Sequence, residues 1–153
     1  MSWAGKLPLS HKIRSLFHIK EQAPSSHSSK RQRSRVRVLE EKDYARLDQA
    51  VQQWVDAKAY RLPDPTIEAV AGRMGVDSAQ LFHYCLEKLG KDFRSWRREL
   101  RVEDAKVLLR EEPQTSIATI GRRVGFNDRS NFAKQFRSTT GYLPSEWRAQ
   151  LLG

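Results

Sequence analysis

The chain has 153 residues, a length typical of one domain with or without a tail, and a formal net charge of +10 at pH 7. Its single cysteine, Cys85, excludes an internal disulfide and a cysteine-based metal cluster. No stretch approaches the roughly 18 to 20 apolar residues that cross a membrane. The start, Met1–Phe17, is interrupted by Lys6, Lys12 and Arg14 and lacks the apolar core of a secretory signal. We therefore expect a cytoplasmic protein that needs no cofactor.

The positive charge is concentrated at the amino-terminal end. Residues 1–42 hold ten Lys/Arg against three Asp/Glu, a surplus of +7, whereas the rest holds 18 against 15, a surplus of +3. Because this segment is polar and has little to bury, we predict a flexible, disordered or weakly ordered basic arm or linker over residues 1–42. Its basic run 30–37 could contact nucleic-acid phosphates or serve only as a soluble linker. The stretch 9–19 could form a helix on a partner, although a solvated linker is the simpler interpretation.

Helical periodicity begins at Asp43. An apolar stripe follows at the spacing of one helix face: Tyr44, Leu47, Val51, Trp54, Val55 and, at its end, Lys58. Two prolines around Asp64 stop this helix. A longer helix is predicted over residues 92–112, and at about 1.5 Å per residue it is roughly 30 Å long. Its inward-facing residues are expected to be Phe93, Trp96, Leu100, Ala105, Leu108 and Leu109.

The segment from Ile117 to Arg148 repeats an earlier part of the chain. The offset is 50 residues up to Gly125 and 51 beyond it. The matched pairs are Ile67/Ile117, Val70/Ile120, Ala71/Gly121, Arg73/Arg123, Met74/Val124, Gly75/Gly125, Leu81/Phe132, Cys85/Phe136, Gly90/Gly141, Trp96/Trp147 and Arg97/Arg148. Such self-similarity indicates a duplicated structural unit.

Each copy has the order expected of a helix-turn-helix: an amphipathic helix with a small residue, a glycine turn, and a second helix with apolar residues at i and i+4. Gly75 and Gly125 are expected to supply the left-handed conformation that ends the first helix. Side-chain caps are predicted at the helix starts. The candidates are Thr66 and Asp77 in the first copy, and Ser116 with Asn127 or Asp128 in the second.

The second copy closely resembles the signature of the AraC/XylS transcription regulators. The matching residues are Ile117, Gly121, Val124, Gly125, Phe126, Phe132, Phe136, Gly141, Pro144, Trp147 and Arg148. The first copy and the helix after it also fit, through Leu81, Gly90, Phe93, Trp96, Arg101, Ala105, Leu108 and Leu109. Pro144, at a first-turn position, is expected to open a short final helix that ends near Leu151. One position departs from the family pattern: Leu143 stands where the family usually has a Thr or Ser cap, which leaves the start of this last helix open.

This resemblance covers residue 43 to the end and implies an all-α fold of seven helices. Two helix-turn-helix units, about 66–90 and 116–141, would be joined by a long central helix at about 92–112. It also implies a DNA-binding domain over residues 43–153, with double-stranded DNA as the partner and RNA polymerase as a second partner. Two units about one DNA turn apart, roughly 34 Å, match the length of the central helix.

The second helix of each unit would enter the major groove and present its outward residues to the bases. We predict base contacts from Ala79, Gln80, Phe82 and His83 in the first unit, and from Arg129, Ser130, Asn131 and Ala133 in the second. Gln80 suits adenine, His83 suits guanine or a phosphate, Phe82 suits a thymine methyl and Arg129 suits guanine. Lys134 and Arg137 are predicted to contact phosphates. A solvated surface role is the alternative for each.

Two other sets of residues receive structural interpretations. Cys85 lies on the apolar face four residues after Leu81, so we expect a small buried hydrophobe. Arg97, Arg98 and Arg101 could reach phosphates, but pairing with Glu99, Glu103 and Asp104 is the preferred interpretation. With no carboxylate pair, metal cluster or phosphate loop in the sequence, we expect no enzyme.

Three functional hypotheses follow. The first is a sequence-specific DNA-binding transcription regulator that inserts both recognition helices into adjacent major-groove segments. The second is the DNA-binding output fragment of a larger regulator whose sensor or effector domain lies elsewhere. The third is an architectural protein that binds DNA without sequence preference through the charge of its arm.

Overall fold

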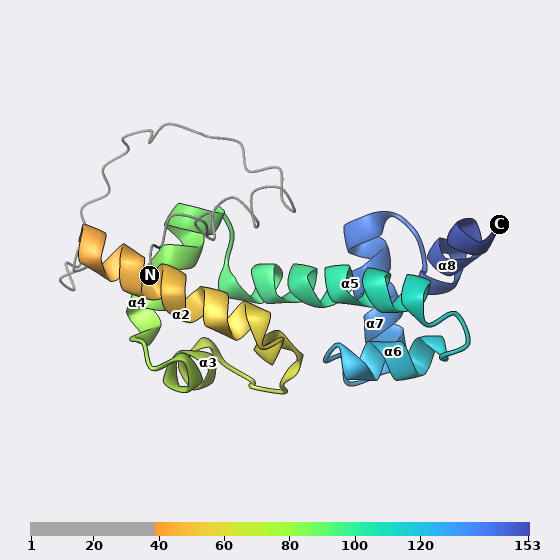
Figure 1. Cartoon of the computed structure of the whole chain (residues 1–153), viewed down its shortest axis with the longest axis horizontal. Helices are drawn as coiled ribbons and strands as arrows, with labels where there is room; N and C mark the ends of the chain where they lie inside the picture. Colours follow the sequence, from red (N-terminus) through yellow and green to blue (C-terminus); the bar gives the residue numbers. More distant parts are fainter. Residues whose placement is uncertain (1–38) are drawn as a thin grey trace, which may run out of the picture.

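The computed structural model describes residues 39–153, and all of these residues are in helices or the short connections between them (Figure 1). The all-α prediction is therefore confirmed for the described part of the chain. The predictions for segments 9–19 and 30–37 lie outside the described residues. The predicted arm extends too far, because Leu39 is buried with 8% of its surface exposed and the first helix begins at Glu41.

Seven α-helices lie within residues 39–153, together with one 3-10 turn and one π-helical turn. Their bounds are α2 Glu41–Asp56, η1 (3-10) Ala59–Arg61, α3 Ile67–Met74, α4 Ser78–Tyr84, η2 (π) Cys85–Leu89, α5 Phe93–Glu111, α6 Ile117–Arg123, α7 Arg129–Thr140 and α8 Pro144–Leu152. Among these described helices, none has the length and apolarity required to cross a membrane.

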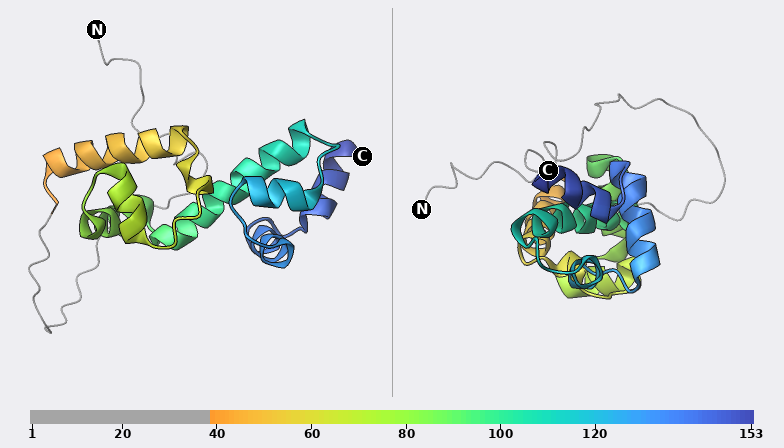
Figure 2. Two further views of the ribbon diagram at one scale, coloured as in Figure 1. Left: turned by 90° about the horizontal axis from the view of Figure 1, so that it is seen from below. Right: turned by 90° about the vertical axis from the view of Figure 1, so that its right-hand side faces the viewer.

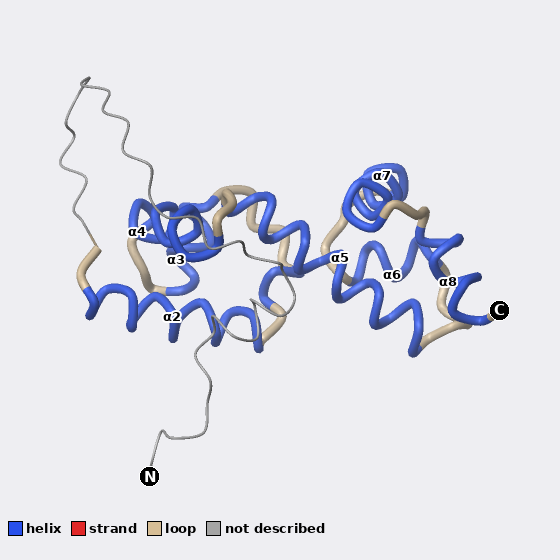
Figure 3. The backbone as a smooth tube through the Cα atoms, turned by 90° about the horizontal axis from the view of Figure 1, so that it is seen from above, coloured by secondary structure: helices blue, strands red, loops and turns tan. Residues whose placement is uncertain are grey.

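The central helix α5 connects two lobes (Figure 1). From here on, each unit means one whole lobe, that is, a helix-turn-helix with the helix packed beside it. The first unit contains α2, α3 and α4, and the second unit contains α6, α7 and α8 around the other end of α5 (Figures 2 and 3). Each unit has its own apolar core, and α5 contributes to both. Its first half supplies Phe93, Trp96 and Leu100 to the first core, and its second half supplies Val102, Ala105, Leu108 and Leu109 to the second.

The burial along α5 agrees with the predicted inward face, with two additions. All six residues expected to face inward are buried, and Val102 and Asp104 are buried as well. Asp104 is a charged residue with only 7% of its surface exposed, so it requires partners. The transition from the first core to the second falls between Leu100 and Val102, which places Arg101 at the boundary between the units.

The apolar stripe of α2 ends before the predicted position. Leu47, Val51 and Trp54 are buried, but Lys58 lies beyond the end of the helix and is exposed. Lys58 has a φ of 52°, in the left-handed region, so it turns the chain instead of extending the helix face. Including Lys58 in the stripe was wrong, because the pattern of spacing does not show where the helix ends.

The helix carrying Cys85 changes its winding midway. It is α-helical through Tyr84 and then makes a π-helical turn, Cys85–Leu89, before Gly90 ends it with a φ of 68°. Cys85 is completely buried, and burial raises the pKa of its thiol to about 12. The interpretation of Cys85 as a small core residue is therefore confirmed.

The last helix begins at Pro144 although its cap position holds an apolar residue. The backbone N–H of Leu143 donates to the Glu146 carboxylate at 2.8 Å, so the side chain of the third helical residue stabilises the helix start from inside. Of the two bonds of a capping box, only the one from the cap backbone to Glu146 can form, because Leu143 has no side-chain acceptor. This bond is enough to start the helix, and the departure from the family pattern at Leu143 does not displace it.

Candidate nucleic-acid interface

In the first unit, local hydrogen bonds set the angle between α3 and α4. Thr66 Oγ1 accepts from the Ala69 N–H at 3.2 Å and caps α3. Gly75, with a φ of 71°, ends α3, and the Val76 N–H returns to the Ala71 carbonyl at 3.0 Å. Asp77 Oδ1 then accepts from the Gln80 N–H at 3.0 Å and starts α4. The turn is therefore fixed on both sides, which holds α4 in a defined orientation.

The second unit repeats these bonds at the matching positions. Ser116 Oγ accepts from the Thr119 N–H at 3.1 Å. The Phe126 N–H returns to the Gly121 carbonyl at 2.9 Å, and Asp128 Oδ1 accepts from the Asn131 N–H at 2.7 Å. The cap of α7 is thus Asp128, one of the two residues predicted for it. The two copies share backbone structure as well as sequence pattern.

The predicted base-reading residues of the first unit lie together on the outward side of α4. Ala79 and Phe82 are exposed, Phe82 with 45% of its surface, while Gln80 and His83 are partly exposed. The rings of Phe82 and His83 meet edge to face with centroids 5.5 Å apart. Buried Leu81 fixes the opposite side of the helix in the core. The outward surface of α4 therefore combines two apolar and two polar side chains, and α4 itself carries no Lys, Arg, Asp or Glu.

The predicted residues of the second unit form a more cationic surface on α7. Arg129, Lys134 and Arg137 are exposed, as are Ser130 and Asn131. Ala133 is partly exposed. Asn131 accepts a bond from Gln135 Nε2 at 3.3 Å, and Phe132 and Phe136 are completely buried on the core side. The outward surface of α7 therefore suits phosphates and guanine edges.

The charge difference between the two surfaces extends beyond these helices. Residues 113–153 hold six Lys/Arg against two Asp/Glu, whereas residues 64–112 hold nine against ten. The hydroxyl of Tyr84 donates to Asp48 of α2, and that of Tyr44 donates to Glu87 of the turn after α4, so two carboxylates belong to the first unit around α4. We infer a weaker attraction of polyanions to the first unit than to the second.

Arg46 was not predicted to belong to this surface. It lies on α2, and its Nη2 donates to Gln80 Oε1 at 3.0 Å. The Gln80 oxygen can accept a second bond, so this contact is compatible with adenine pairing. Because α2 and α4 are 34 residues apart along the chain at this contact, no local pattern in the sequence indicates it.

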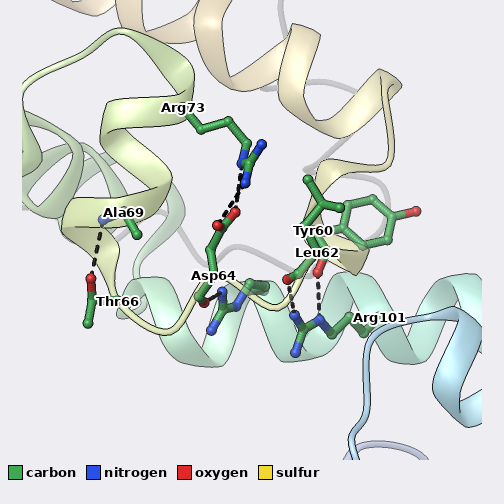
Figure 4. Close-up of polar contacts among 8 residues, drawn as sticks. Tyr60, Leu62, Asp64, Thr66, Ala69, Arg73 and Arg101 are labelled. Atoms are coloured by element: carbon green, nitrogen blue, oxygen red, sulfur yellow. Dashed lines mark hydrogen bonds and ion pairs between the residues drawn. The ribbon is translucent and has the colours of Figure 1, made fainter.

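The arginines of α5 differ from the preferred interpretation. Arg97 Nη1 donates to the Asp64 carbonyl at 2.5 Å. Arg101 donates to the Tyr60 and Leu62 carbonyls at 2.6 and 2.9 Å (Figure 4). Burial and the neighbouring Arg97 lower the pKa of Arg101 to about 10.

The predicted acidic partners of these arginines have other ion pairs. Lys91 pairs with Glu99, Lys106 pairs with Glu103, and Arg61 pairs with Asp104. The predicted pairings of Arg97 and Arg101 were therefore wrong. Both side chains extend to backbone carbonyls of the preceding connection, which no helical spacing rule indicates.

The geometry defines a tandem helix-turn-helix: two similarly capped helices, α4 and α7, with exposed outward residues, each anchored on its own core and joined by α5. Among residues 39–153, no group of three or more His, Cys, Asp or Glu side chains is placed to hold a metal ion.

Comparison with known proteins agrees with this class. The profile of a helix-turn-helix domain family matches residues 70–150. The arabinose operon regulatory protein of Salmonella typhimurium is 34% identical over 117 residues, which cover 75% of this chain and 41% of that protein. The chain therefore spans about two fifths of the length of this relative.

Two solved structures share the fold. The C-terminal domain of AraT, a response regulator from Geobacillus stearothermophilus, has a TM-score of 0.61 and 27% identity, covering 69% of this chain and 84% of that one. A transcriptional regulator of Chromobacterium violaceum, described as containing an AraC-type DNA-binding domain, has a TM-score of 0.59 and 28% identity, covering 70% and 92%. The chain belongs to the AraC/XylS family of helix-turn-helix proteins.

Proposed function

We propose that this chain is a sequence-specific DNA-binding transcription regulator that places α4 and α7 in two adjacent major-groove segments. The observation that carries the proposal is the duplication of one capped geometry, with Asp77 and Asp128 starting helices whose outward residues are exposed. An α-helix fits the major groove, and the exposed residues near its start reach the base edges.

The two helices read their half-sites by different chemistry. In the first unit, Phe82 packs against a thymine methyl, His83 donates to guanine or a phosphate, and Gln80 pairs with adenine, with Ala79 close to the bases. Because this surface has few cations, its contribution to binding depends on base sequence more than on phosphate attraction.

The second unit supplies most of the charge. Arg129 binds guanine through two parallel bonds, and Ser130, Asn131 and Ala133 contact neighbouring base edges. Lys134 and Arg137 bind phosphates on either side of the groove and fix the register of α7. This division of roles makes the second unit the main source of affinity and of salt dependence.

Selection of bound fragments from a random-sequence pool by the full chain at near-physiological salt tests this function. We expect enrichment of one asymmetric site, with His83→Ala relaxing the preference in one half and Arg129→Ala in the other. If both variants bound the selected site as tightly as the parent chain, the assignment of the base-reading residues would be wrong.

RNA polymerase and a sensor or effector domain are the further partners that we propose. The 41% coverage of the arabinose regulator supports an additional domain in relatives of this chain. Transcription from a promoter carrying the selected site, measured with purified polymerase, tests the first partner and gives the sign of regulation. A longer reading frame upstream of Met1 would support the second.

A further inference from the structure

The connection between α2 and α3 lies against the middle of α5, where the two units meet. We call residues 58–64 of this connection the strut. Its centre is anchored in the first core, because Tyr60 is buried with 6% of its surface exposed and its ring meets that of Trp54 at 6.1 Å between centroids. The strut is therefore a packed part of the first unit.

Several polar contacts hold the strut to the first unit and to the middle of α5. The carbonyls of Tyr60, Leu62 and Asp64 accept from Arg101 and Arg97, and Figure 4 shows the Arg101 guanidinium directed at the first two. The Asp64 carboxylate accepts from Arg73 of α3 at 2.8 and 2.9 Å. The backbone of the strut is thus held at every second residue, at positions 60, 62 and 64.

A second set of contacts connects the strut to the second unit. Arg61 donates to both oxygens of Asp104, at 2.5 and 2.8 Å, and the Lys58 ammonium lies 3.4 Å from the same carboxylate. Asp104 lies on the half of α5 that carries the second core, beside buried Ala105. The bonds from Arg61 outweigh burial and hold the pKa of Asp104 below its usual value.

The turn of the second helix-turn-helix also lies against the strut. A Cβ added at Gly125 would lie 2.6 Å from Arg101 Nε and 2.8 Å from the Arg61 carbonyl oxygen. At the matching position of the first unit, Gly75, an added Cβ would meet nothing within 4 Å. Gly125 is therefore required for close approach in addition to its positive φ, whereas Gly75 is required only for its φ.

We propose that the strut is a positioning element that fixes α7 relative to α4, so that the chain accepts DNA half-sites at one spacing only. A single helix between two lobes can bend at its middle, and the strut adds a second connection across that point. This inference rests on the proposed function for its consequence on DNA, but the rigidity itself is a property of the free protein.

The consequence on DNA follows from helix geometry. Adding one base pair between the half-sites moves one of them by about 3.4 Å and rotates it by roughly 35° around the duplex. A rigid pair of recognition helices cannot follow this change and loses one half-site. We expect the parent chain to lose at least about tenfold in affinity when one base pair is added or removed.

The test variant is Arg61→Met combined with Asp104→Leu. Replacing both members of a buried ion pair by apolar residues of similar volume is often neutral for stability, so the fold is retained while the link is removed. The matched control is Asp64→Asn combined with Arg73→Met, which removes an ion pair of the same strut within the first unit only. When one base pair is added or removed between the half-sites, we expect the DNA affinity of the test variant to fall by less than about threefold. The control should behave like the parent chain.

A measurement on the free protein makes the proposal independent of DNA. Nitroxide labels at Glu68→Cys and Ser138→Cys, exposed residues of α3 and α7, report the distance between the units, while Cys85 is completely buried. Pulsed electron resonance is expected to give one narrow distance distribution for the parent chain and the control, and a broader one for the test variant.

The possible outcomes separate the two proposals. Equal distance distributions and equal spacing profiles in all three chains would overturn the role of the strut, even if specific DNA binding is found. A broader distribution in the test variant, with no selected site for the parent chain, would support the strut and contradict the proposed function. A second pair of variants gives the same comparison. If the strut hypothesis is correct, Gly125→Ala should change the distribution of distances between the labels, and Gly75→Ala should leave it like that of the parent chain.

Discussion

Gly121 lies directly against the ring of Phe132, and a Cβ at residue 121 would come within 2.5 Å of Phe132 Cδ1. The first unit has Ala71 and Leu81 at the matching positions. The larger ring of Phe132 is thus paired with glycine, and the smaller side chain of Leu81 is paired with alanine. This pairing sets how closely the two helices of each unit approach.

We predict that Gly121→Ala destabilises the chain by about 1 to 3 kcal/mol, because Phe132 is completely buried and has no space to move. Chemical denaturation at pH 7 measures the change. The control is Gly72→Ala in α3, where an added Cβ meets nothing within 4 Å. That change should stabilise the helix by up to about 1 kcal/mol. Equal effects of the two substitutions would contradict the close approach.

The thymine contact of Phe82 can be tested with deoxyuridine, which lacks only the methyl group. Replacing thymine in the first half-site should weaken binding about fourfold, the effect of roughly 0.8 kcal/mol for one buried methyl. In Phe82→Ala, the same replacement should have no effect. Replacements in the second half-site serve as the control, because their effect should be identical in both chains. Loss of affinity in Phe82→Ala without this coupling would indicate an indirect role.

Arg129 and Lys134 should respond differently to base sequence and salt. Lys134→Ala is expected to weaken binding to all sequences. It should also reduce the magnitude of the slope of log affinity against log salt concentration by about 1, because one phosphate contact is lost. Arg129→Ala should cost about 1 to 3 kcal/mol on the selected site and relax the preference at one base pair. Binding titrations at several salt concentrations, on the selected site and on single-base variants, measure both. If Lys134→Ala changed the base preference and Arg129→Ala changed only the salt dependence, the assignment of Arg129 to bases and Lys134 to phosphates would be reversed.

The ion pair of Arg61 and Asp104 predicts a pH dependence of stability. Because the folded pKa of Asp104 is lowered, its contribution is complete above the unfolded value of about 3.9 and is lost as the pH falls through the folded pKa. At pH 7, Asp104→Asn should cost about 3 kcal/mol. Denaturation at pH 7, 4 and 3 should show this difference shrinking in acid, and a difference independent of pH would exclude a charged Asp104 as its source.

The parts of the fold that depend on neighbouring residues could be predicted from the sequence. Asp77 and Ser116 act as caps because a side chain three residues before an N–H reaches it in any helix start. The repeat made the prediction specific, since the same signals occur twice in register. The start of α8 lacks a Ser or Thr cap at Leu143, but Pro144 at its first position predicted it correctly, and Glu146 bonds back to the cap residue.

The contacts between segments far apart in the chain could not be predicted. Arg61 and Asp104 are 43 residues apart, and neither lies at a position that marks it as a partner of the other. Arg101 binds carbonyl oxygens, which every residue has, so its partners leave no trace in the sequence. Arg46 joined the candidate site for the same reason, through a contact between two separate helices.

Hydroxyl-radical and methylation footprinting of the full chain on its selected site would test the central claim most directly. We expect an asymmetric site near two helical turns long, with two protected major-groove segments on one face of the duplex. The protection of one segment should weaken in His83→Ala and that of the other in Arg129→Ala. Uniform protection that disappears evenly with salt, or a single protected segment unaffected by His83→Ala, would contradict recognition by two helix-turn-helix units.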